Sequence, residues 1–277
     1  YGVSYNSYLI DDEMVALVDT VDICYFEVYL RKIKQVIGER PINYLIINHM
    51  EPDHSGSIRL IKQHYPGIII VGNKQTFGMI EGFYGVTGEQ YLVKEGDFLA
   101  LGHHKLRFYM TPMVHWPETM MTFDETDGVL FSGDGFGCFG TVDGGFLDTR
   151  INVDKYWGEM VRYYSNIVGK YGSPVQKALQ KLGGLPISAI CSTHGPVWTE
   201  NIAKVIGIYD RLSRYDADEG VVIAYGSMYG NTEQMAEAIA EELSAQGVKN
   251  IVMHNVTKSH PSYIIADIFR YKGLIIG

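Results

Sequence analysis

The sequence predicts an α/β protein in two parts, and three features of the chain support this prediction. Short apolar strands alternate with turns and a few helices through about residue 218. From residue 219 onward the pattern changes to a strand, a hydroxyl-rich loop and an amphipathic helix, which is the start of a βαβ unit. Polar residues able to bind metals follow several strands. We therefore expect one domain over residues 1–218 and a doubly wound parallel-sheet domain over residues 219–277.

The first part contains the strands and helices of a mixed fold. Apolar runs rich in β-branched and aromatic residues are typical of buried strands, and apolar residues three and four positions apart are typical of helices. On these grounds we expect strands over residues 5–10, 14–18, 44–47, 67–71, 105–110, 119–124, 129–132 and 187–192. We expect helices over residues 24–37, 57–65, 74–82, 155–169, 173–183 and 203–218.

The second part is short. A strand over residues 221–225 precedes a loop and a helix over residues 233–246, and further strands are expected over residues 250–256 and 273–277. A doubly wound domain needs more strands than these. We therefore expect the chain to end inside its second domain. The early strand at residues 5–10 indicates that the first domain is also incomplete at its N-terminus.

Composition excludes several classes of function. The chain has 277 residues, of which 46% are hydrophobic, and this suits a globular protein with a sizeable core. A formal charge of −9 without any basic block argues against a nucleic-acid partner, and no apolar run is long enough to cross a bilayer. The cysteines Cys24, Cys138 and Cys191 lie far apart and form no Cys-x-x-Cys pair, so we expect a reducing, cytoplasmic location.

The segment from His49 to His54 is the first candidate site. It carries two imidazoles and two carboxylates directly after an apolar run. Open α/β sheets place their chemistry at the carboxyl ends of strands, and these side chains bind divalent metals. The alternative is a polar loop in which Asp53 or Ser55 caps a helix near Ile58, which leaves both histidines without a role. We therefore expect metal ligands at His49, Glu51, Asp53 and His54.

Three further polar residues stand just after expected strands. They are His115, Asp134 and His194, and each follows an apolar run as the His49 cluster does. Taken singly, such a residue is more often a hydrogen-bonded polar group than a metal ligand. Together with the cluster, the three predict a single metal constellation at one end of the sheets.

The loop over residues 227–232 is the second candidate site. It lies between an expected strand and an expected helix and is rich in hydroxyls and backbone N–H groups. Such a loop binds phosphate at the positive end of a helix, and the absence of triphosphate and dinucleotide glycine patterns favours a monophosphate. The alternative is an ordinary turn capped by Thr232. The candidate binding residues are Ser227, Met228, Tyr229, Gly230, Asn231 and Thr232.

The order of these residues resembles the metallo-β-lactamase superfamily and, within it, the flavodiiron proteins, also called A-type flavoproteins. That family has Glu at the position of Glu51, where zinc hydrolases of the fold usually have His, and a His-Trp-Pro-Asp/Glu run, here at residues 115–118. The second loop resembles the FMN phosphate loop of flavodoxin, with Asn231 and Thr232 matching well. The resemblance implies an α/β fold in which a metallo-β-lactamase-like αββα sandwich is followed by a flavodoxin-like doubly wound parallel sheet, truncated in this chain.

The cofactors that the resemblance implies are two non-haem iron ions and FMN. Carboxylate and imidazole ligands without thiolate suit iron as it changes oxidation state. By resemblance, one iron would be bound by His49, Glu51 and His115, the other by Asp53, His54 and His194, and Asp134 would bridge the two.

The function that the resemblance implies is an oxidoreductase that reduces O2 to water, NO to N2O, or both. Electrons would pass from a donor such as rubredoxin or a flavin reductase through FMN to the irons, in a head-to-tail homodimer or a dimer of dimers. Two other interpretations stay open, a zinc-dependent hydrolase of the same fold and a redox or gas-sensing module without turnover. Glu51 and the flavin loop argue against the hydrolase. The motifs do not report the preference between O2 and NO.

Overall fold

The protein is described over residues 2–277 in a computed structural model, and its first half is built around a five-stranded sheet. The strand order is β1-β2-β3-β4-β5. Strand β1 pairs antiparallel with β2, and the other neighbours are parallel. The strands span β1 (Tyr8–Ile10), β2 (Ala16–Val18), β3 (Tyr44–Ile46), β4 (Ile69–Gly72) and β5 (Gln90–Leu92).

A second five-stranded sheet follows, with the order β10-β9-β8-β7-β6. Strands β9 and β10 are parallel, and the remaining neighbours are antiparallel. The strands span β6 (Phe98–Ala100), β7 (Lys105–Met110), β8 (Met120–Asp124), β9 (Val129–Gly133) and β10 (Ala189–Ser192).

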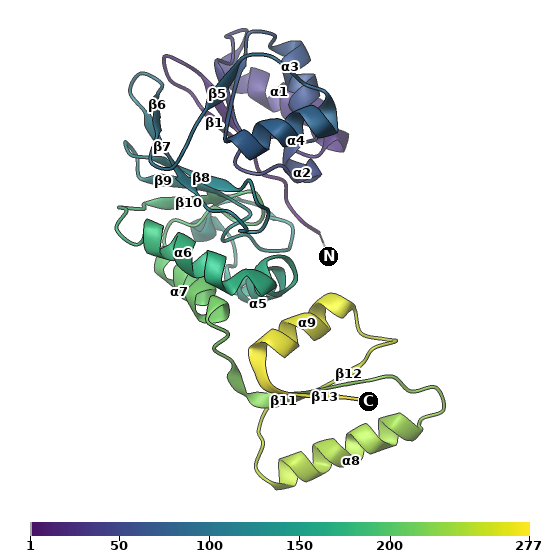
Figure 1. The fold of residues 1–277 in the computed structure, drawn as a ribbon. Helices are drawn as coiled ribbons and strands as arrows, with labels where there is room; N and C mark the ends of the chain where they lie inside the picture. Colours follow the sequence, from purple (N-terminus) through teal and green to yellow (C-terminus); the bar gives the residue numbers. More distant parts are fainter. Residues whose placement is uncertain (1) are drawn as a thin grey trace.

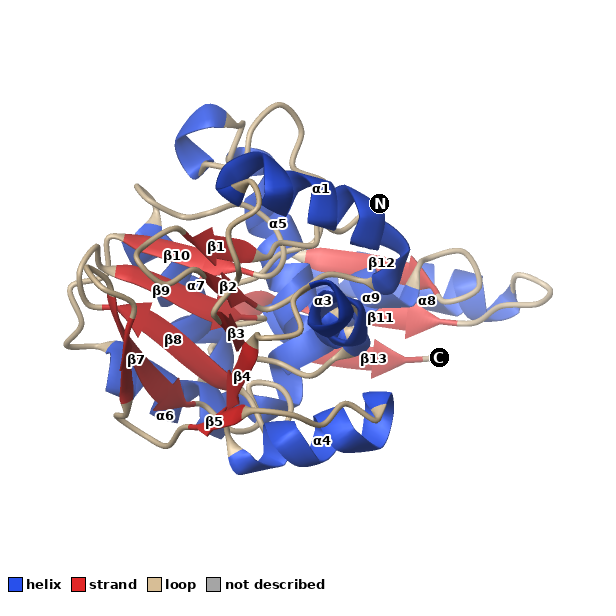
Figure 2. Ribbon diagram, turned by 90° about the horizontal axis from the view of Figure 1, so that it is seen from above, coloured by secondary structure: helices blue, strands red, loops and turns tan. Residues whose placement is uncertain are grey.

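The two sheets pack face to face, and helices cover the outer face of each (Figures 1 and 2). Successive residues of a strand point to opposite faces, so Leu45 packs beneath the helices α1, α3 and α4, whereas Ile46 packs between the sheets. A third apolar cluster lies between the second sheet and the helices α5, α6 and α7. The expected αββα sandwich is therefore confirmed. Its helices span α1 (Phe26–Ile37), α2 (Pro52–Ser55), α3 (Ile58–His64), α4 (Lys74–Tyr84), α5 (Asp154–Tyr163), α6 (Gly172–Leu182) and α7 (Ile202–Ser213).

The C-terminal part contains a separate parallel sheet of order β12-β11-β13. Helices α8 and α9 lie on opposite faces of this sheet, and α9 is the one that faces α5 (Figure 1). The parallel order and the alternation of strand and helix agree with the flavodoxin-like segment that the sequence predicts. The elements span β11 (Asp218–Tyr225), α8 (Asn231–Ala245), β12 (Ile251–Asn255), α9 (Pro261–Arg270) and β13 (Tyr271–Ile276).

One buried arginine ties the two parts together. The guanidinium of Arg162 on α5 donates a hydrogen bond of 3.0 Å to Ser262 Oγ on α9. Its central carbon also lies 4.4 Å from the ring centre of Phe139 and 4.7 Å from that of Tyr263. A guanidinium that lies over an aromatic ring gains cation–π attraction, so these contacts stabilise the packing of α9 against the sandwich.

The predicted elements differ from the structure in several places. The helix expected over residues 203–218 is too long, because α7 ends at Ser213 and Asp218 already pairs with Tyr271 as the first residue of β11. Tyr215, with φ of 58°, turns the chain between them. Strands β5 and β6 and the helices α2 and α9 are absent from the prediction. The three-residue strand β5 is wholly exposed, so it carries no apolar pattern that could reveal it. The domain boundary at residues 218–219 stays a prediction.

Two further observations concern the helices and the cysteines. Across residues 2–277, every helix is too short or too polar to span a bilayer. The cysteines are all free: Cys24 is exposed, and Cys138 and Cys191 are buried. Burial raises the pKa of Cys191 to about 12, so this thiol serves as a small packing group and not as a nucleophile.

Candidate metal centre

The loop after β3 carries the first candidate ligands. His49 leaves the strand, and Asp53 and His54 lie in the single turn of helix α2. Asp19 stabilises this loop, because its Oδ1 accepts hydrogen bonds from the backbone N–H groups of Asn48 (2.8 Å) and His49 (3.3 Å). The alternative of a capped helix is wrong, because neither α2 nor α3 has a side-chain cap.

The other three candidates come from the second sheet. His115 lies on the turn between β7 and β8, Asp134 directly follows β9, and His194 lies just beyond β10. Because β8, β9 and β10 are neighbours, the loops at these strand ends lie side by side at the same end of the strands. Packing of the two sheets places these strand ends next to the carboxyl end of β3. The backbone N–H of Met120 donates to the carbonyl of Asn48 at 3.0 Å, which joins the two sheets at this point.

The structure gathers the seven candidates into two adjoining groups. In each group, the ligand atoms all lie within 4.8 Å of one another. Asp134 stands between the groups, since its Oδ2 lies 3.0 Å from His115 Nε2 and its Oδ1 lies 3.0 Å from His54 Nε2. The first group contains His49, Glu51, His115 and Asp134, and the second contains Asp53, His54 and His194.

Within each group a carboxylate faces two imidazole nitrogens. Glu51 Oε2 lies 3.1 Å from His115 Nε2 and 3.4 Å from His49 Nε2. In the second group, Asp53 Oδ2 lies 3.3 Å from the Nε2 atoms of both His54 and His194. All four imidazoles therefore present Nε2, and each group is completed by one oxygen of the shared aspartate.

These donor atoms fit a pair of divalent cations. The Nε2 atoms of His49 and His115 face each other at 3.3 Å. His54 Nε2 is buried and has no hydrogen-bond partner among the described residues, because its contact with Asp134 lacks hydrogen-bond alignment. The same holds for the buried Asp53 Oδ1. Buried polar atoms are nearly always paired, so unpaired atoms at a carboxylate–imidazole cluster indicate a place for metal.

Without metal, the charges in the cluster shift one another's protonation. Direct hydrogen bonds from His115 and His49 lower the pKa of Glu51 to about 2. Burial alone would raise the pKa of Asp134, but the facing His54 and His49 hold it well below its usual range. Burial would lower the pKa of His49, and Asp134 instead raises it well above its usual value. The lowered pKa values of Glu51 and Asp134 and the raised pKa of His49 favour ionised acids beside a protonated imidazole, and a metal ion would replace that proton.

The cluster is open on its acidic side. The side chains of His54 and Asp134 are 0% and 2% exposed, whereas those of Asp53 and Glu51 are 24% and 36% exposed. A small molecule therefore reaches the cluster past the two carboxylates. A surface cavity of about 970 Å³ is lined in part by Pro52 and Trp116, which are sequence neighbours of candidate ligands, but none of the seven candidates lines it.

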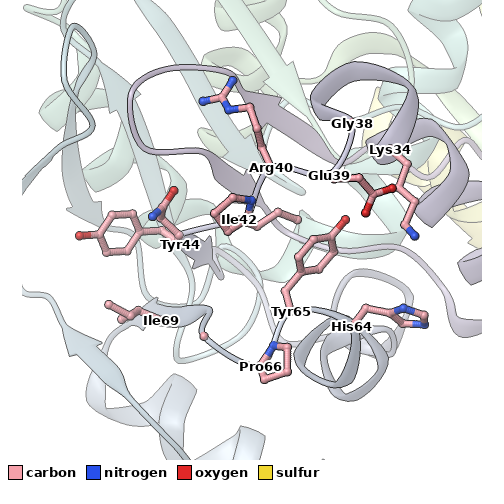
Figure 3. Close-up of a pocket in the computed structure, with 13 residues that line it drawn as sticks. Lys34, Gly38, Glu39, Arg40, Ile42, Tyr44, His64, Tyr65, Pro66 and Ile69 are labelled. Carbon is pink, nitrogen blue, oxygen red and sulfur yellow. The ribbon is translucent and has the colours of Figure 1, made fainter.

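A different pocket lies far from this chemistry. A cavity of about 400 Å³ is lined by residues that include Lys34, Arg40, Tyr44, His64 and Tyr65. Figure 3 shows these side chains. The cavity includes the first residue of β3, whereas the metal cluster follows the last residue of that strand. It therefore lies at the opposite end of β3, and none of the candidate ligands lines it.

Of the six predicted phosphate-loop residues, Ser227, Met228, Tyr229 and Gly230 lie between β11 and α8, and Asn231 and Thr232 are the first two residues of α8. Gly230 adopts φ of 87°, which favours glycine, and Ser227 Oγ accepts a hydrogen bond from its N–H at 3.1 Å. The side chains of Met228 and Tyr229 are both exposed. Helix α8 has no side-chain cap at its N-terminus, so the alternative in which Thr232 caps the turn is wrong. An uncapped N-terminus after a parallel strand fits a phosphate group.

A third group of possible ligands lies elsewhere. His104 Nδ1 lies 2.7 Å from Asp124 Oδ2, and Asp127 is close to both. Asp124 is already paired, because its other oxygen accepts a hydrogen bond from the N–H of Thr126 at 3.0 Å. An ordinary His–Asp hydrogen bond explains this group, so it indicates no metal by itself.

The sandwich, the paired metal cluster and the parallel C-terminal sheet define a class: a metallo-β-lactamase-fold metal domain joined to a flavodoxin-like segment. Residues 3–195 match the family described as "ODP family beta lactamase", and residues 223–277 match the family described as "Flavodoxin". The chain belongs to the flavodiiron protein family.

Individual relatives agree with this assignment. The anaerobic nitric oxide reductase flavorubredoxin of Vibrio vulnificus (strain YJ016) is 33% identical over an alignment that covers 100% of this chain and 57% of that protein. Rubredoxin oxygen:oxidoreductase from Desulfovibrio gigas superposes with a TM-score of 0.96 at 30% identity, covering 100% of this chain and 70% of that one. The flavodiiron protein from Giardia intestinalis gives a TM-score of 0.95 at 28% identity, covering 99% and 68%. The chain thus spans little more than half of the flavorubredoxin.

Sequence reasoning missed three buried residues at the cluster. Asp19 holds the loop backbone, and burial raises its pKa to about 6. Glu118 accepts a hydrogen bond from His49 Nδ1–H at 2.9 Å. The Tyr163 ring centre lies 5.6 Å from that of His194, and its buried hydroxyl has no hydrogen-bond partner among the described residues. The sequence pointed only to Glu118, because it is the last residue of the run at residues 115–118. Asp19 follows an ordinary strand and Tyr163 lies in an ordinary helix, so no motif marks them.

Proposed function

We propose that this chain carries the catalytic domain of a flavodiiron oxidoreductase that reduces O2 to water, NO to N2O, or both. The observation that carries the proposal is the placement of Asp134, whose two oxygens each complete one of two adjoining imidazole–carboxylate groups. Such an arrangement fits a bridging ligand between two metal ions. The flavorubredoxin and the oxygen:oxidoreductase among the relatives are named for the two reactions, which supports both substrates as candidates.

The proposed ligands are the seven predicted residues. Imidazole and carboxylate donors without thiolate suit iron, and when bound, two iron ions would supply electrons to a diatomic gas. His49, Glu51 and His115 would hold one ion, Asp53, His54 and His194 the other, and Asp134 both.

The rest of the site keeps the ligands in place and controls access. Asp19 holds the loop that carries His49, and Thr193 Oγ1 donates a hydrogen bond of 2.6 Å to Asp134 Oδ1. The buried histidines keep bulk water away from one side of the cluster, which strengthens electrostatic interactions there. Glu51 and Asp53 border the open side, where the gas would enter.

FMN is the proposed second cofactor. The support is the match of residues 223–277 to flavodoxin and the uncapped N-terminus of α8 behind Gly230. The phosphate would lie against the loop formed by Ser227, Met228, Tyr229, Gly230, Asn231 and Thr232. A donor such as rubredoxin or a flavin reductase, a head-to-tail homodimer or dimer of dimers, and a cytoplasmic location stay predictions.

The decisive experiment is metal analysis and anaerobic kinetics of the full-length protein purified from its own host. We expect two iron ions and one FMN per chain, and catalytic consumption of O2 or NO when a reductant is supplied. Zinc in both positions without flavin absorbance would favour the hydrolase. Bound iron without turnover of either gas would favour the sensor.

A further inference from the structure

Glu118 is buried at a cost that its contacts do not offset. Its side chain is 0% exposed, and one oxygen, Oε1, accepts hydrogen bonds from His49 Nδ1–H (2.9 Å) and from the backbone N–H of Met50 (2.8 Å). The other oxygen, Oε2, is buried without a hydrogen-bond partner among residues 2–277. Burying a carboxylate is costly unless both oxygens are well paired. Stability alone therefore does not account for this residue.

Glu118 joins the two sheets beside the first metal group. Met50 follows β3 of the first sheet, whereas Glu118 belongs to the turn between β7 and β8 of the second. The same turn carries His115, whose Nε2 lies 3.3 Å from His49 Nε2. The turn itself is fixed, because Asn73 Nδ2 donates to the backbone carbonyl of Glu118 at 2.6 Å. One rigid turn thus supplies one ligand and orients another.

The carboxylate also selects one tautomer of His49. A carboxylate only accepts, so when His49 is neutral its proton lies on Nδ1, and Nε2, which points toward Glu51, is left free to bind a metal ion. The other histidines have different partners. His194 Nδ1–H donates to the backbone carbonyl of Ser4 at 2.7 Å, and His54 Nδ1 has no hydrogen-bond partner among the described residues. Of the Nδ1 atoms of these three rings, only that of His49 lies against a carboxylate in the part of the chain that the structure describes, whereas the Nε2 atoms of all three face carboxylates of the metal cluster.

We propose that Glu118 is a positioning residue that holds the His49 ring for metal and so acts selectively on the first of the two metal positions. The inference rests on the proposed function, in which the seven ligands bind two ions. Partners of this kind orient a ligand and raise its basicity, and their loss costs about 10–100-fold in metal affinity. We expect that loss at one position, with the other unchanged.

The test is titration of metal-free, full-length protein with Co²⁺ under anaerobic conditions, followed by calorimetry and visible absorption. Glu118→Leu removes the acceptor, and Glu118→Gln keeps an acceptor oxygen without the charge. The matched control is Glu125→Gln on the same hairpin, since Glu125 pairs with Lys105 and Arg107 at the surface. We expect about 10–100-fold weaker binding of one ion for Glu118→Leu, a smaller loss for Glu118→Gln and none for the control.

A second readout does not depend on affinity. In the Zn²⁺-loaded protein we expect the Nδ1–H proton of His49 to exchange slowly with solvent in wild type and Glu118→Gln, and rapidly in Glu118→Leu. If Glu118→Leu does not fold, Glu118→Gln still tests the proposal, because we expect it to weaken Co²⁺ binding at one metal position and not at the other.

The outcomes separate this inference from the proposed function. A wild-type protein that binds no Co²⁺ refutes both. Two ions bound with unchanged affinities in the Glu118 variants refute the role of Glu118 and leave the metal site standing. Equal losses at both positions refute it as well, because they indicate a general structural role.

Discussion

The Sγ atom of Cys138 lies 2.3 Å from the point that a Cβ atom on Gly195 would occupy. Gly195 directly follows the candidate ligand His194 and adopts φ of 83°. Both facts exclude a side chain here, because Cβ atoms never approach so closely and because L residues rarely adopt that φ. The backbone that presents His194 is therefore packed against the thiol.

We expect Gly195→Ala to destabilise the protein by about 3 kcal/mol, through overpacking and backbone strain. Because the clash moves the backbone next to His194, metal binding at the second group should weaken too. Thermal unfolding and metal analysis measure the two effects. The control is Gly207→Ala in the exposed middle of α7, where a Cβ meets nothing within 4 Å and should add about 0.5–1 kcal/mol of stability. A Gly195→Ala variant as stable as wild type contradicts the close contact.

The position of Asp134 predicts a distinctive pattern of metal loss. We expect Glu51→Ala to weaken the first group and His194→Ala the second, whereas Asp134→Ala should release both ions. The reason is that each oxygen of Asp134 serves one group. Metal content and affinity measure this, and losses should exceed the roughly 100-fold cost of removing an outer partner.

Glu51→Ala and His194→Ala should also abolish gas reduction while the full-length protein keeps its flavin. A single-ion loss for Asp134→Ala would show that its carboxylate does not bridge. Retained activity in both of the other variants would remove the ligand assignment.

Opposite pH effects are expected for metal binding and for the stability of the metal-free protein. For His49, His115 and His194, burial acts to lower the pKa, but the facing carboxylates raise it above the ordinary value of 6.5. A histidine whose pKa is higher in the folded state than in the unfolded state stabilises the folded protein, and this contribution is complete below about pH 6.5. The contribution is lost as the pH rises through the raised pKa. Metal requires neutral imidazoles, so its affinity should rise over the same range.

Urea unfolding of metal-free protein and Co²⁺ titration, each at about pH 6 and pH 9, measure these two trends. Proton release on Co²⁺ binding, seen as a dependence of the heat on the buffer, gives a direct check. Metal affinity that falls with rising pH would contradict the charge arrangement.

Arg162 should hold the C-terminal segment to the sandwich. We expect Arg162→Met to cost about 1–3 kcal/mol, because it removes the hydrogen bond to Ser262 and the ring contacts with Phe139 and Tyr263. Hydrogen exchange should accelerate in α9 and leave the metal strands unchanged. The control, Arg214→Met, breaks a surface pair with Asp210 and should change stability by less than about 0.5 kcal/mol. Equal exchange in both variants would contradict a linking role.

The sequence predicts well what depends on local pattern. Apolar runs such as residues 44–47 identify strands, and each polar residue just beyond a strand can be named as a candidate ligand. All seven named residues meet in two groups. The iron-type ligand set rests on the family resemblance and not on spacing, because His49 and His115 belong to different stretches of the chain and meet only when the two sheets pack.

Residues that act through tertiary contacts escape such reasoning. Glu118 reads as the end of a turn, and only packing of the two sheets places its carboxylate on His49. Asp19 reads as a polar residue after a strand, yet it organises a loop 29 positions further along the chain. Short exposed strands such as β5 leave no apolar pattern at all. The expected helix over residues 203–218 is longer than α7, because the residues after Ser213 are polar like the last turn of the helix and no change of pattern marks its end.

The donor set of the paired cluster also concerns how the protein is assembled in a cell. Imidazole and carboxylate atoms that hold iron also hold zinc, and zinc binds more tightly than ferrous iron to most such sites. A chain that folds in zinc-rich surroundings would therefore keep the same sandwich and the same ligand contacts, but it would hold an ion that cannot change oxidation state. Which ion the newly made chain meets first, and not the ligand geometry, would then decide whether a molecule becomes active.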